Sequence, residues 1–325
     1  MTYETDVPNT KHEGVRAEGL GKRFGDFWAL QDLDLDVPAG SVLGLLGHNG
    51  AGKTTAIRIL TTLSQPTTGR ATVAGFDVEK DASSVRGKIG VAGQASTVDG
   101  LLTGRANLEM VGRLYGLSSQ ESKARATDLL EQVRITDSAD KLVKDYSGGM
   151  RRRVDLAASL VAAPTVLFLD EPTTGLDPQS RKELWTMLRD HVDEGGTLVL
   201  TTQYLEEADR LADDIVVLDH GRVAASGTPA ELKRRVGGDR IEVSVAAPAD
   251  LGPATDAMTV LADGQPIADE DARMVSVPVA EGTGVIEVVR ALDVAGVPVT
   301  DVHLRSATLD DVFLSLTSPQ DLVVS

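Results

Sequence analysis

One glycine-rich run limits the fold of this chain more than any other feature. The run Gly47-His48-Asn49-Gly50-Ala51-Gly52-Lys53-Thr54-Thr55 follows the apolar stretch 42–46 and precedes the helix-compatible stretch 56–60. Glycines allow backbone N–H groups to converge on phosphate oxygens, and the following helix points its partly positive N-terminus at the same charge. This strand-loop-helix setting makes a chance match improbable, so it predicts a phosphate-binding P-loop.

Two side chains of the run add specific chemistry. Lys53 brings a full positive charge to the phosphates, and the Thr54 hydroxyl is the expected ligand of Mg²⁺, which prefers oxygen donors. We therefore expect residues 47–55 to hold the phosphates of ATP or GTP, and we expect Thr54 to belong to a metal site.

Composition narrows the class of protein. A length of 325 residues favours a large α/β domain plus a smaller one. The formal net charge of -17, without a long basic tract, argues against a protein that binds nucleic acid. The absence of cysteine excludes disulfides and cysteine-based metal sites. There is no apolar run of membrane-spanning length and no signal-peptide core at the N-terminus, so we expect a cytoplasmic protein that a partner can hold at the membrane.

Changes of pattern divide the chain into three predicted parts. They are a polar tail at residues 1–13, an α/β domain at 14–236 and a small α+β domain at 237–325, with Gly237-Gly238 marking the last boundary. In the small domain we expect strands at 241–245, 274–279 and 299–304 and a helix at 285–295. The acidic stretch 248–271 carries little pattern, and we expect it to be partly mobile.

The large domain shows the pattern of a parallel sheet. Its apolar runs at 42–46, 166–169 and 198–200 are continuous, which is typical of strands buried on both faces. Ligands of such sheets bind at the carboxyl ends of the strands, so the polar residues that follow each run should converge on the P-loop. Segment 14–40 predicts short strands with turns, including an alternating strand at 33–37, and segment 215–224 predicts a hairpin.

Acidic residues follow the second of these apolar runs. Asp170 and Glu171 stand where a P-loop hydrolase places a carboxylate for Mg²⁺ and a base that activates water. Strands often end in acidic residues, so the pair alone is weak support. Upstream, Tyr146-Ser147-Gly148-Gly149-Met150 opens a helix whose start suits an anion, because the glycines and Ser147 leave backbone N–H groups available.

These three motifs, in this order, resemble the nucleotide-binding subunit of ABC transporters over residues 14–232. The resemblance implies an ATPase in which Glu171 activates water and Asp170 serves the metal region together with Thr54 and Gln94. It further implies that Phe24 stacks on adenine, that Gln94 reaches Mg²⁺ and the attacking water, and that the loop containing Asp177 crosses to a partner subunit.

The same resemblance implies a homodimer with a divided site. Two copies would close head to tail, so that the γ-phosphate of ATP bound to the P-loop of one copy is held by Ser147, Gly148 and Gly149 of the other. Met150 is the next residue of this signature. A single copy should then hydrolyse ATP poorly.

The chain departs from that family at one position. Gln203 stands where a histidine is usual after the strand at 198–200. Its amide can donate a hydrogen bond to the γ-phosphate but cannot carry a proton, which leaves Glu171 as the plausible general base. A site that binds ATP without hydrolysing it is the alternative, and Lys53, Asp170 and Glu171 argue against it.

Three strings narrow the resemblance to the daunorubicin/doxorubicin-resistance type of ABC ATPase: residues 146–153, 201–209 and 309–314. That type pairs with a separate membrane permease and exports drugs. The arginines at 151–153 are interpreted as a solvated helix face near the phosphates rather than a nucleic-acid site. Phe27 and Trp28 are interpreted as strand packing.

Several alternatives remain open at this stage. Leu309, Val312, Phe313 and Leu316 share one helix face, which would either pack on its own domain or contact a dimer partner or permease. The same ATPase subunit could drive export of a lipid or a polysaccharide. A regulatory protein that binds nucleotide without hydrolysing it is an alternative from another class. A soluble ABC protein acting on ribosomes or DNA is disfavoured, because the chain has one P-loop and no long inserted coiled coil.

Overall fold

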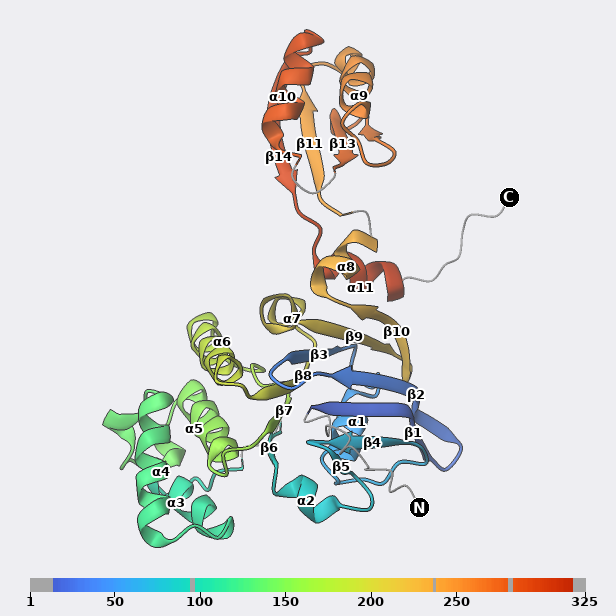
Figure 1. Cartoon of the computed structure of the whole chain (residues 1–325). Helices are drawn as coiled ribbons and strands as arrows, with labels where there is room; N and C mark the ends of the chain where they lie inside the picture. The colour runs from blue at the N-terminus through green and yellow to red at the C-terminus, as the bar shows by residue number, and fades with distance from the viewer. Residues whose placement is uncertain (1–13, 94–96, 236–237, 280–282, 318–325) are drawn as a thin grey trace, which may run out of the picture. The chain divides into compact units, whose positions relative to one another are not determined.

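The computed structural model describes residues 14–93, 97–235, 238–279 and 283–317. The chain divides into two compact units, Met1–Gly227 and Thr228–Ser325 (Figure 1). This division lies ahead of the boundary suggested by the glycine pair at 237–238, because helix α8 (Pro229–Arg235) contacts helix α11 (Leu309–Thr317) within the second unit. The boundary after residue 236 stays a prediction.

A six-stranded sheet forms the centre of the first unit, in the order β10-β9-β3-β8-β7-β6. Neighbouring strands are parallel, except that β10 runs antiparallel to β9 at one edge. All residues of β3, β7 and β8 are buried, as the continuous apolar runs predict. The bounds are β3 Val42–Leu46, β6 Ile89–Ala92, β7 Val166–Asp170, β8 Thr197–Thr202, β9 Asp214–Asp219 and β10 Arg222–Gly227.

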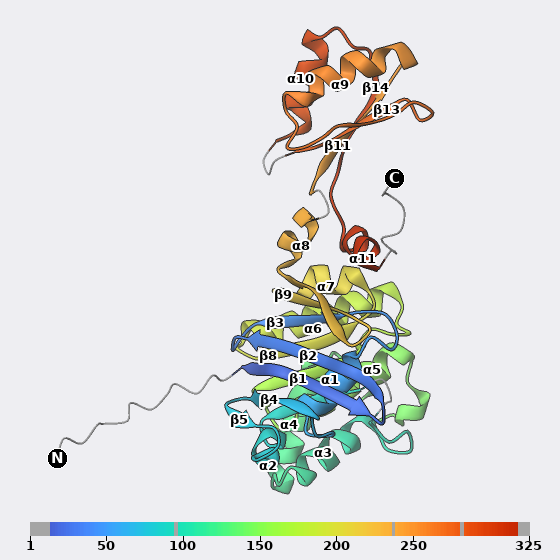
Figure 2. The same ribbon diagram turned by 90° about the vertical axis from the view of Figure 1, so that its right-hand side faces the viewer.

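The second sheet of this unit is antiparallel, in the order β2-β1-β4-β5 (Figure 2). The prediction of short strands over 14–40 is wrong, because β1 and β2 have 10 and 11 residues. Gly19, Gly21 and Asp34 lie within these two strands, whose pairing continues past them with shifts in register. The alternation at 33–37 is confirmed. The bounds are β1 Val15–Phe24, β2 Phe27–Val37, β4 Thr68–Val73 and β5 Phe76–Asp77.

The main core joins both sheets to helix α1 (Lys53–Leu60). It includes Leu20 and Leu30 of the antiparallel sheet, Leu45 and Phe168 of the parallel sheet, and Ile59 of α1, each of them fully buried. Burial of large apolar side chains contributes about 1.5–3 kcal/mol each. This packing fixes the helix that follows the P-loop against the strands on either side of it.

A helical layer with its own core extends from the parallel sheet (green in Figure 1). Helices α3, α4 and α5 contact one another and bury Leu108, Leu129, Leu130 and Val154 between them. Thr103 and Ser118 cap the first two helices by accepting hydrogen bonds from backbone N–H groups. The bounds of the remaining helical segments of this unit are α2 Ala82–Arg86, α3 Gly104–Leu114, α4 Ser119–Gln132, α5 Gly148–Leu160, α6 Pro178–Asp193 and α7 Leu205–Leu211, with short 3-10 turns at Thr136–Ser138 and Val143–Asp145.

The second unit contains an antiparallel sheet in the order β12-β13-β11-β14, with helices α9 and α10 packed on its core. The predicted strands and the predicted helix are confirmed. The bounds are β11 Arg240–Val245, α9 Leu251–Thr259, β12 Ile267–Asp269, β13 Met274–Pro278, α10 Val285–Val294 and β14 Val299–Arg305, with a 3-10 turn at Pro248–Asp250.

The pattern-poor stretch 248–271 is ordered, which corrects the expectation of a mobile segment. Helix α9 buries Leu251, Ala254 and Met258 against the sheet, and β12 pairs with β13. Gly252 and a proline at position 253 obscure this pattern in the sequence, although proline is tolerated in the first turn of a helix. The helical spacing of the three buried residues was therefore the signal that could have revealed the helix.

Helix α11 packs on α8 of the same unit, with Leu309 and Val312 buried. This contact favours packing within the unit over a partner contact for these two side chains, while the side chain of Leu316 lies outside the described part of the structure. Among the helices of the described residues, none has the length and apolar character needed to cross a membrane.

Candidate active site

The P-loop connects β3 to α1, as its sequence setting predicts. Its glycines are required by geometry, since Gly47, Gly50 and Gly52 have φ values of 153°, 88° and 111°. A Cβ atom on Gly47 would lie 2.5 Å from the Leu218 carbonyl oxygen, so this residue also permits close approach to β9. The loop ends at Gly52, and Lys53, Thr54 and Thr55 form the first turn of α1.

Lys53 is folded back over the loop. Its Nζ donates hydrogen bonds to the carbonyl oxygens of Gly47 at 2.7 Å and His48 at 3.2 Å, and it lies 3.9 Å from Glu171 Oε1. Burial lowers the pKa of Lys53, whereas the nearby charges of Glu171 and Asp170 raise it. The ammonium is thus held at the loop by carbonyls and carboxylates, in the region where phosphates would compete for it.

Asp170 links the P-loop helix to the middle of the sheet. The Thr54 hydroxyl donates to Asp170 Oδ2 at 3.1 Å, and the Thr201 hydroxyl donates to Asp170 Oδ1 at 2.5 Å. These residues come from α1, β7 and β8, and β8 lies between β3 and β7 in the sheet. The strand order therefore brings together oxygen atoms that are far apart in the sequence. Thr201 was not identified as a site residue from the sequence.

Glu171 has an unusual backbone conformation. Its φ of 49° is left-handed, which is uncommon for a residue with a side chain. Its N–H donates to the Thr201 carbonyl and hydroxyl oxygens, each at 3.1 Å, and its Oε2 accepts from the Thr174 hydroxyl at 3.2 Å. The carboxylate is buried and fixed beside Lys53, as a positioned base requires.

A cleft of about 200 Å³ lies beside Glu171, and Gly148 of the Ser-Gly-Gly helix start also lines it. Ser147 caps α5 by accepting from the Met150 N–H at 3.2 Å, and both Ser147 and Gly148 are exposed. Gly149 is buried against α6, where an added Cβ would lie 2.4 Å from Ser180 Oγ. The structure thus brings this helix start close to the end of β7.

Asp177 is the N-terminal cap of α6. Its Oδ1 accepts from the N–H groups of Gln179 at 3.1 Å and Ser180 at 3.0 Å. These bonds, the largest contribution coming from Ser180, lower the pKa of Asp177. A contact of Asp177 with a partner subunit stays a prediction.

The arginines at 151–153 do not form a solvated face, which corrects that interpretation. The Arg152 guanidinium donates to the carbonyl oxygens of Gly93 at 2.6 Å, Pro172 at 2.7 Å and Glu171 at 3.2 Å. The Arg153 side chain is 15% exposed and pairs with Glu183 at 3.4 Å. Arg152 therefore ties α5 to the backbone around the acidic pair, a role that the sequence did not reveal because the carbonyls come from distant segments.

Gln203 follows β8 and is exposed. The same segment carries a second residue that sequence reasoning missed. Glu207 of α7 is fully buried, accepts from Trp185 Nε1 at 3.1 Å, and has its pKa raised mainly by burial. This buried carboxyl, four residues after Gln203, anchors the start of α7 to α6.

The remaining predicted residues differ in how far the structure describes them. Phe24 ends β1 and is 55% exposed, so its ring is open to a base stacked on it. Phe27 is 67% exposed, which contradicts its interpretation as strand packing, while Trp28 is half-buried. Gln94 lies outside the described residues. Asp155 of α5 accepts from the Thr97 N–H at 2.7 Å and so fixes the segment that begins at Thr97.

Comparisons with known proteins agree with this geometry. The ABC transporter family model matches residues 30–174, and the model described as ATP-binding protein DrrA1-3-like, C-terminal domain, matches residues 227–317. The daunorubicin resistance ATP-binding protein DrrA2 of Streptomyces coeruleorubidus is 56% identical over 93% of this chain and 94% of its own. The Nod factor export ATP-binding protein I of Cupriavidus metallidurans is 39% identical over 93% of this chain and 97% of its own.

A solved ATP-binding subunit of an ABC transporter covers 69% of this chain and 93% of its own with a TM-score of 0.62 and 27% identity. The fold and the site therefore define a P-loop ATPase of the ABC class, which confirms the predicted fold class and the predicted ATP-binding enzyme. More narrowly, the chain belongs to the family of DrrA-like daunorubicin/doxorubicin resistance ATP-binding proteins.

Proposed function

We propose that this chain hydrolyses ATP to drive a membrane exporter, with an anthracycline-like drug as cargo. The observation that carries the proposal is the convergence of Thr54, Asp170, Glu171 and Lys53, which come from the start of α1 and from the carboxyl end of β7. In this site residues 47–55 hold the phosphates of ATP, and Phe24 stacks on adenine.

The donor set fits Mg²⁺. The Thr54 hydroxyl and the Asp170 carboxylate lie 3.1 Å apart and offer oxygen atoms in a largely buried setting, which suits a hard cation. Thr54, Asp170 and Gln94 would hold the ion. When bound, Mg²⁺ neutralises phosphate charge.

Glu171 is the proposed general base. Its buried carboxylate, held by Thr174, accepts the proton of the attacking water, while Lys53 stabilises charge on the phosphates. Gln203 donates its amide N–H to the γ-phosphate without taking part in proton transfer. The left-handed backbone of Glu171, held by two hydrogen bonds from its N–H to Thr201, fixes the direction of the carboxylate.

We infer that two copies complete the site. The exposed positions of Ser147 and Gly148 leave the start of α5 open to the γ-phosphate of ATP bound to a second copy, and the backbone N–H groups there suit an anion. Met150 and Asp177 belong to the same proposed contact region. ATP joins the two copies, and loss of the γ-phosphate releases them, since the contacts differ between the two states.

The partner is a separate permease, which holds the chain at the cytoplasmic face of the membrane. The drug-resistance relative supports a drug cargo, and the Nod factor export relative supports a cargo other than a drug. The second candidate is therefore export of a lipid or a polysaccharide. A regulatory protein that binds nucleotide without turnover is the alternative from another class. The buried base beside Lys53 argues against it.

Measurements of drug efflux test the cargo, and measurements of ATPase activity test the hydrolysis of ATP. Cells that co-express the chain with the permease encoded beside its gene should retain less of a fluorescent anthracycline than cells with Lys53→Ala. Equal retention, with ATPase activity intact, would reject the anthracycline and favour another cargo. Absence of ATPase activity from the purified complex would reject the exporter and favour the regulatory alternative.

A further inference from the structure

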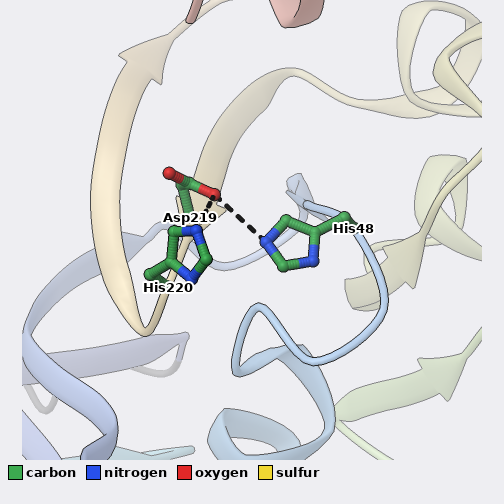
Figure 3. A group of neighbouring side chains, drawn as sticks. All are labelled: His48, Asp219 and His220. Atoms are coloured by element: carbon green, nitrogen blue, oxygen red, sulfur yellow. Dashed lines mark hydrogen bonds and ion pairs between the residues drawn. The ribbon is translucent and has the colours of Figure 1, made fainter. Parts of the chain in front are cut away.

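Three side chains beside the P-loop offer metal-ligating atoms to one another. His48 lies in the loop, Asp219 ends β9, and His220 begins the following turn (Figure 3). One ligand atom from each of the three lies within 4.8 Å of those of the other two. None of the three belongs to the proposed Mg²⁺ site.

We propose that His48, Asp219 and His220 form a binding site for a borderline transition-metal ion such as Zn²⁺. Two imidazole nitrogens and one carboxylate oxygen suit Zn²⁺ with water in the fourth position, whereas Mg²⁺ prefers oxygen ligands. The site therefore differs in chemistry from the metal region around Thr54 and Asp170.

The distances suit a tetrahedral ion. His48 Nε2 lies 3.1 Å and His220 Nε2 lies 3.8 Å from Asp219 Oδ1. Two ligands bonded to a tetrahedral Zn²⁺ at about 2.0–2.1 Å are separated by about 3.3 Å. The two observed separations lie on either side of this value, and the His220 side chain is 85% exposed.

The hydrogen bonding of His48 provides an independent reason for a cation. Its Nδ1 lies 2.7 Å from the Asn49 carbonyl oxygen, which can only accept, so Nδ1 carries a proton. In a neutral ring Nε2 then has a lone pair, and this lone pair faces the Asp219 carboxylate, a second acceptor. A metal ion between Nε2 and Oδ1 satisfies both atoms. Donation of the other ring N–H to a backbone carbonyl is the usual arrangement of a metal-binding histidine.

The backbone holds the three residues together before any ion binds. The Gly221 N–H donates to the Ala51 carbonyl oxygen at 3.0 Å, and the Gly221 carbonyl accepts from the Gln31 N–H at 2.7 Å, which fixes the turn to the P-loop and to β2. His220 and Gly221 have φ values of 46° and 78°, the left-handed pair of a two-residue hairpin turn. Because the backbone of the turn is already ordered, binding of an ion at His220 and Asp219 requires little further loss of conformational entropy.

An ion at this site would connect the P-loop to the β9–β10 hairpin. The His48 carbonyl also accepts from Lys53 Nζ at 3.2 Å, so the ion would restrict the loop that holds the proposed phosphate-binding lysine. Because the ion binds the folded chain, its addition should raise the melting temperature.

Titration of the untagged full chain with ZnCl₂ at neutral pH, without nucleotide, tests the proposal. His220→Asn is the diagnostic variant, because asparagine tolerates the left-handed conformation and lacks the imidazole. His303→Asn is the matched control, since His303 also lies beside carboxylates, 3.0 Å from Glu242 and 3.5 Å from Asp301. We expect His220→Asn to weaken Zn²⁺ binding by about tenfold or more and His303→Asn to leave it unchanged.

Melting curves provide the second readout. Zn²⁺ should stabilise the wild type and the His303→Asn variant more than the His220→Asn variant, whose melting temperature without Zn²⁺ reports whether it folds. Equal Zn²⁺ affinity in wild type and His220→Asn would overturn the proposal. So would a wild type that binds no Zn²⁺, in which case His48 and Asp219 pair directly without an ion.

Discussion

The ammonium of Lys53 lies 3.9 Å from the carboxylate of Glu171, and both side chains are buried. The two residues are separated by more than a third of the chain and come from α1 and from the end of β7. The energetic cost of burying each charge is offset by its attraction to the other charge. Asp170 adds to the negative charge near Lys53. Substitutions at and around this pair test whether the site works as proposed.

Glu171→Gln should bind ATP and dimerise but turn over slowly. The amide keeps the shape of the carboxyl but cannot accept a proton from water, so we expect the steady-state rate of phosphate release to fall by about 10²–10⁴-fold. Size-exclusion chromatography with ATP should show a stable dimer. Glu206→Gln, an exposed neighbour of the buried Glu207 on α7, is the control. A variant at position 171 with a rate near that of the wild type would remove this residue from the role of base.

Thr201→Val should lower both stability and turnover. The substitution keeps the shape but removes the hydroxyl that donates to Asp170 at 2.5 Å and accepts from the Glu171 N–H at 3.1 Å. Loss of these buried bonds should cost about 1–3 kcal/mol in the free energy of unfolding. Thr197→Val, at the other end of β8, removes a hydroxyl that accepts from the Gly40 N–H and should cost stability without a matching loss of ATPase rate. Equal loss of rate in both variants would contradict a specific role for Thr201.

Arg152→Ala should destabilise the first unit. Its guanidinium donates to the carbonyls of Gly93, Pro172 and Glu171, and the substitution removes these bonds. The Glu171 carbonyl keeps its bond from the Thr174 N–H. We expect a loss of about 2–3 kcal/mol in the free energy of unfolding, measured by chemical denaturation. Arg290→Ala, on the exposed side of α10, should change it by less than about 0.5 kcal/mol. Similar effects at both positions would argue against the structural role assigned to Arg152.

Glu207→Gln should change how stability depends on pH. Burial raises the pKa of Glu207 above its ordinary value of 4.5, so the folded chain binds this proton more tightly than the unfolded chain. The stabilisation linked to that proton is present below pH 4.5 and is lost as pH rises from 4.5 through the higher pKa of the folded state. The uncharged variant should therefore gain stability relative to the wild type as pH rises through this window. Denaturant titrations at several pH values measure the difference, and parallel curves would contradict a raised pKa.

The sequence by itself was sufficient for the parts that local pattern specifies. Continuous apolar runs predicted buried β3, β7 and β8, and the glycine-rich run between a strand and a helix predicted the P-loop, because each depends on neighbouring residues. The order of the P-loop, the Ser-Gly-Gly helix start and the acidic pair was sufficient to suggest the ABC class.

Tertiary structure decided the contacts that pair distant segments. The hydrogen bond from Thr201 to Asp170 depends on β8 lying beside β7 in the sheet. The hydrogen bonds of Arg152 depend on carbonyls from two separate segments, at Gly93 and at residues 171–172. Neither strand order nor the position of a backbone carbonyl can be detected in the local periodicity of a sequence. The half-buried arginines at 151–153 and the helix within 248–271 therefore became clear only in the structure. Packing of side chains that are far apart in sequence is what fixed these residues.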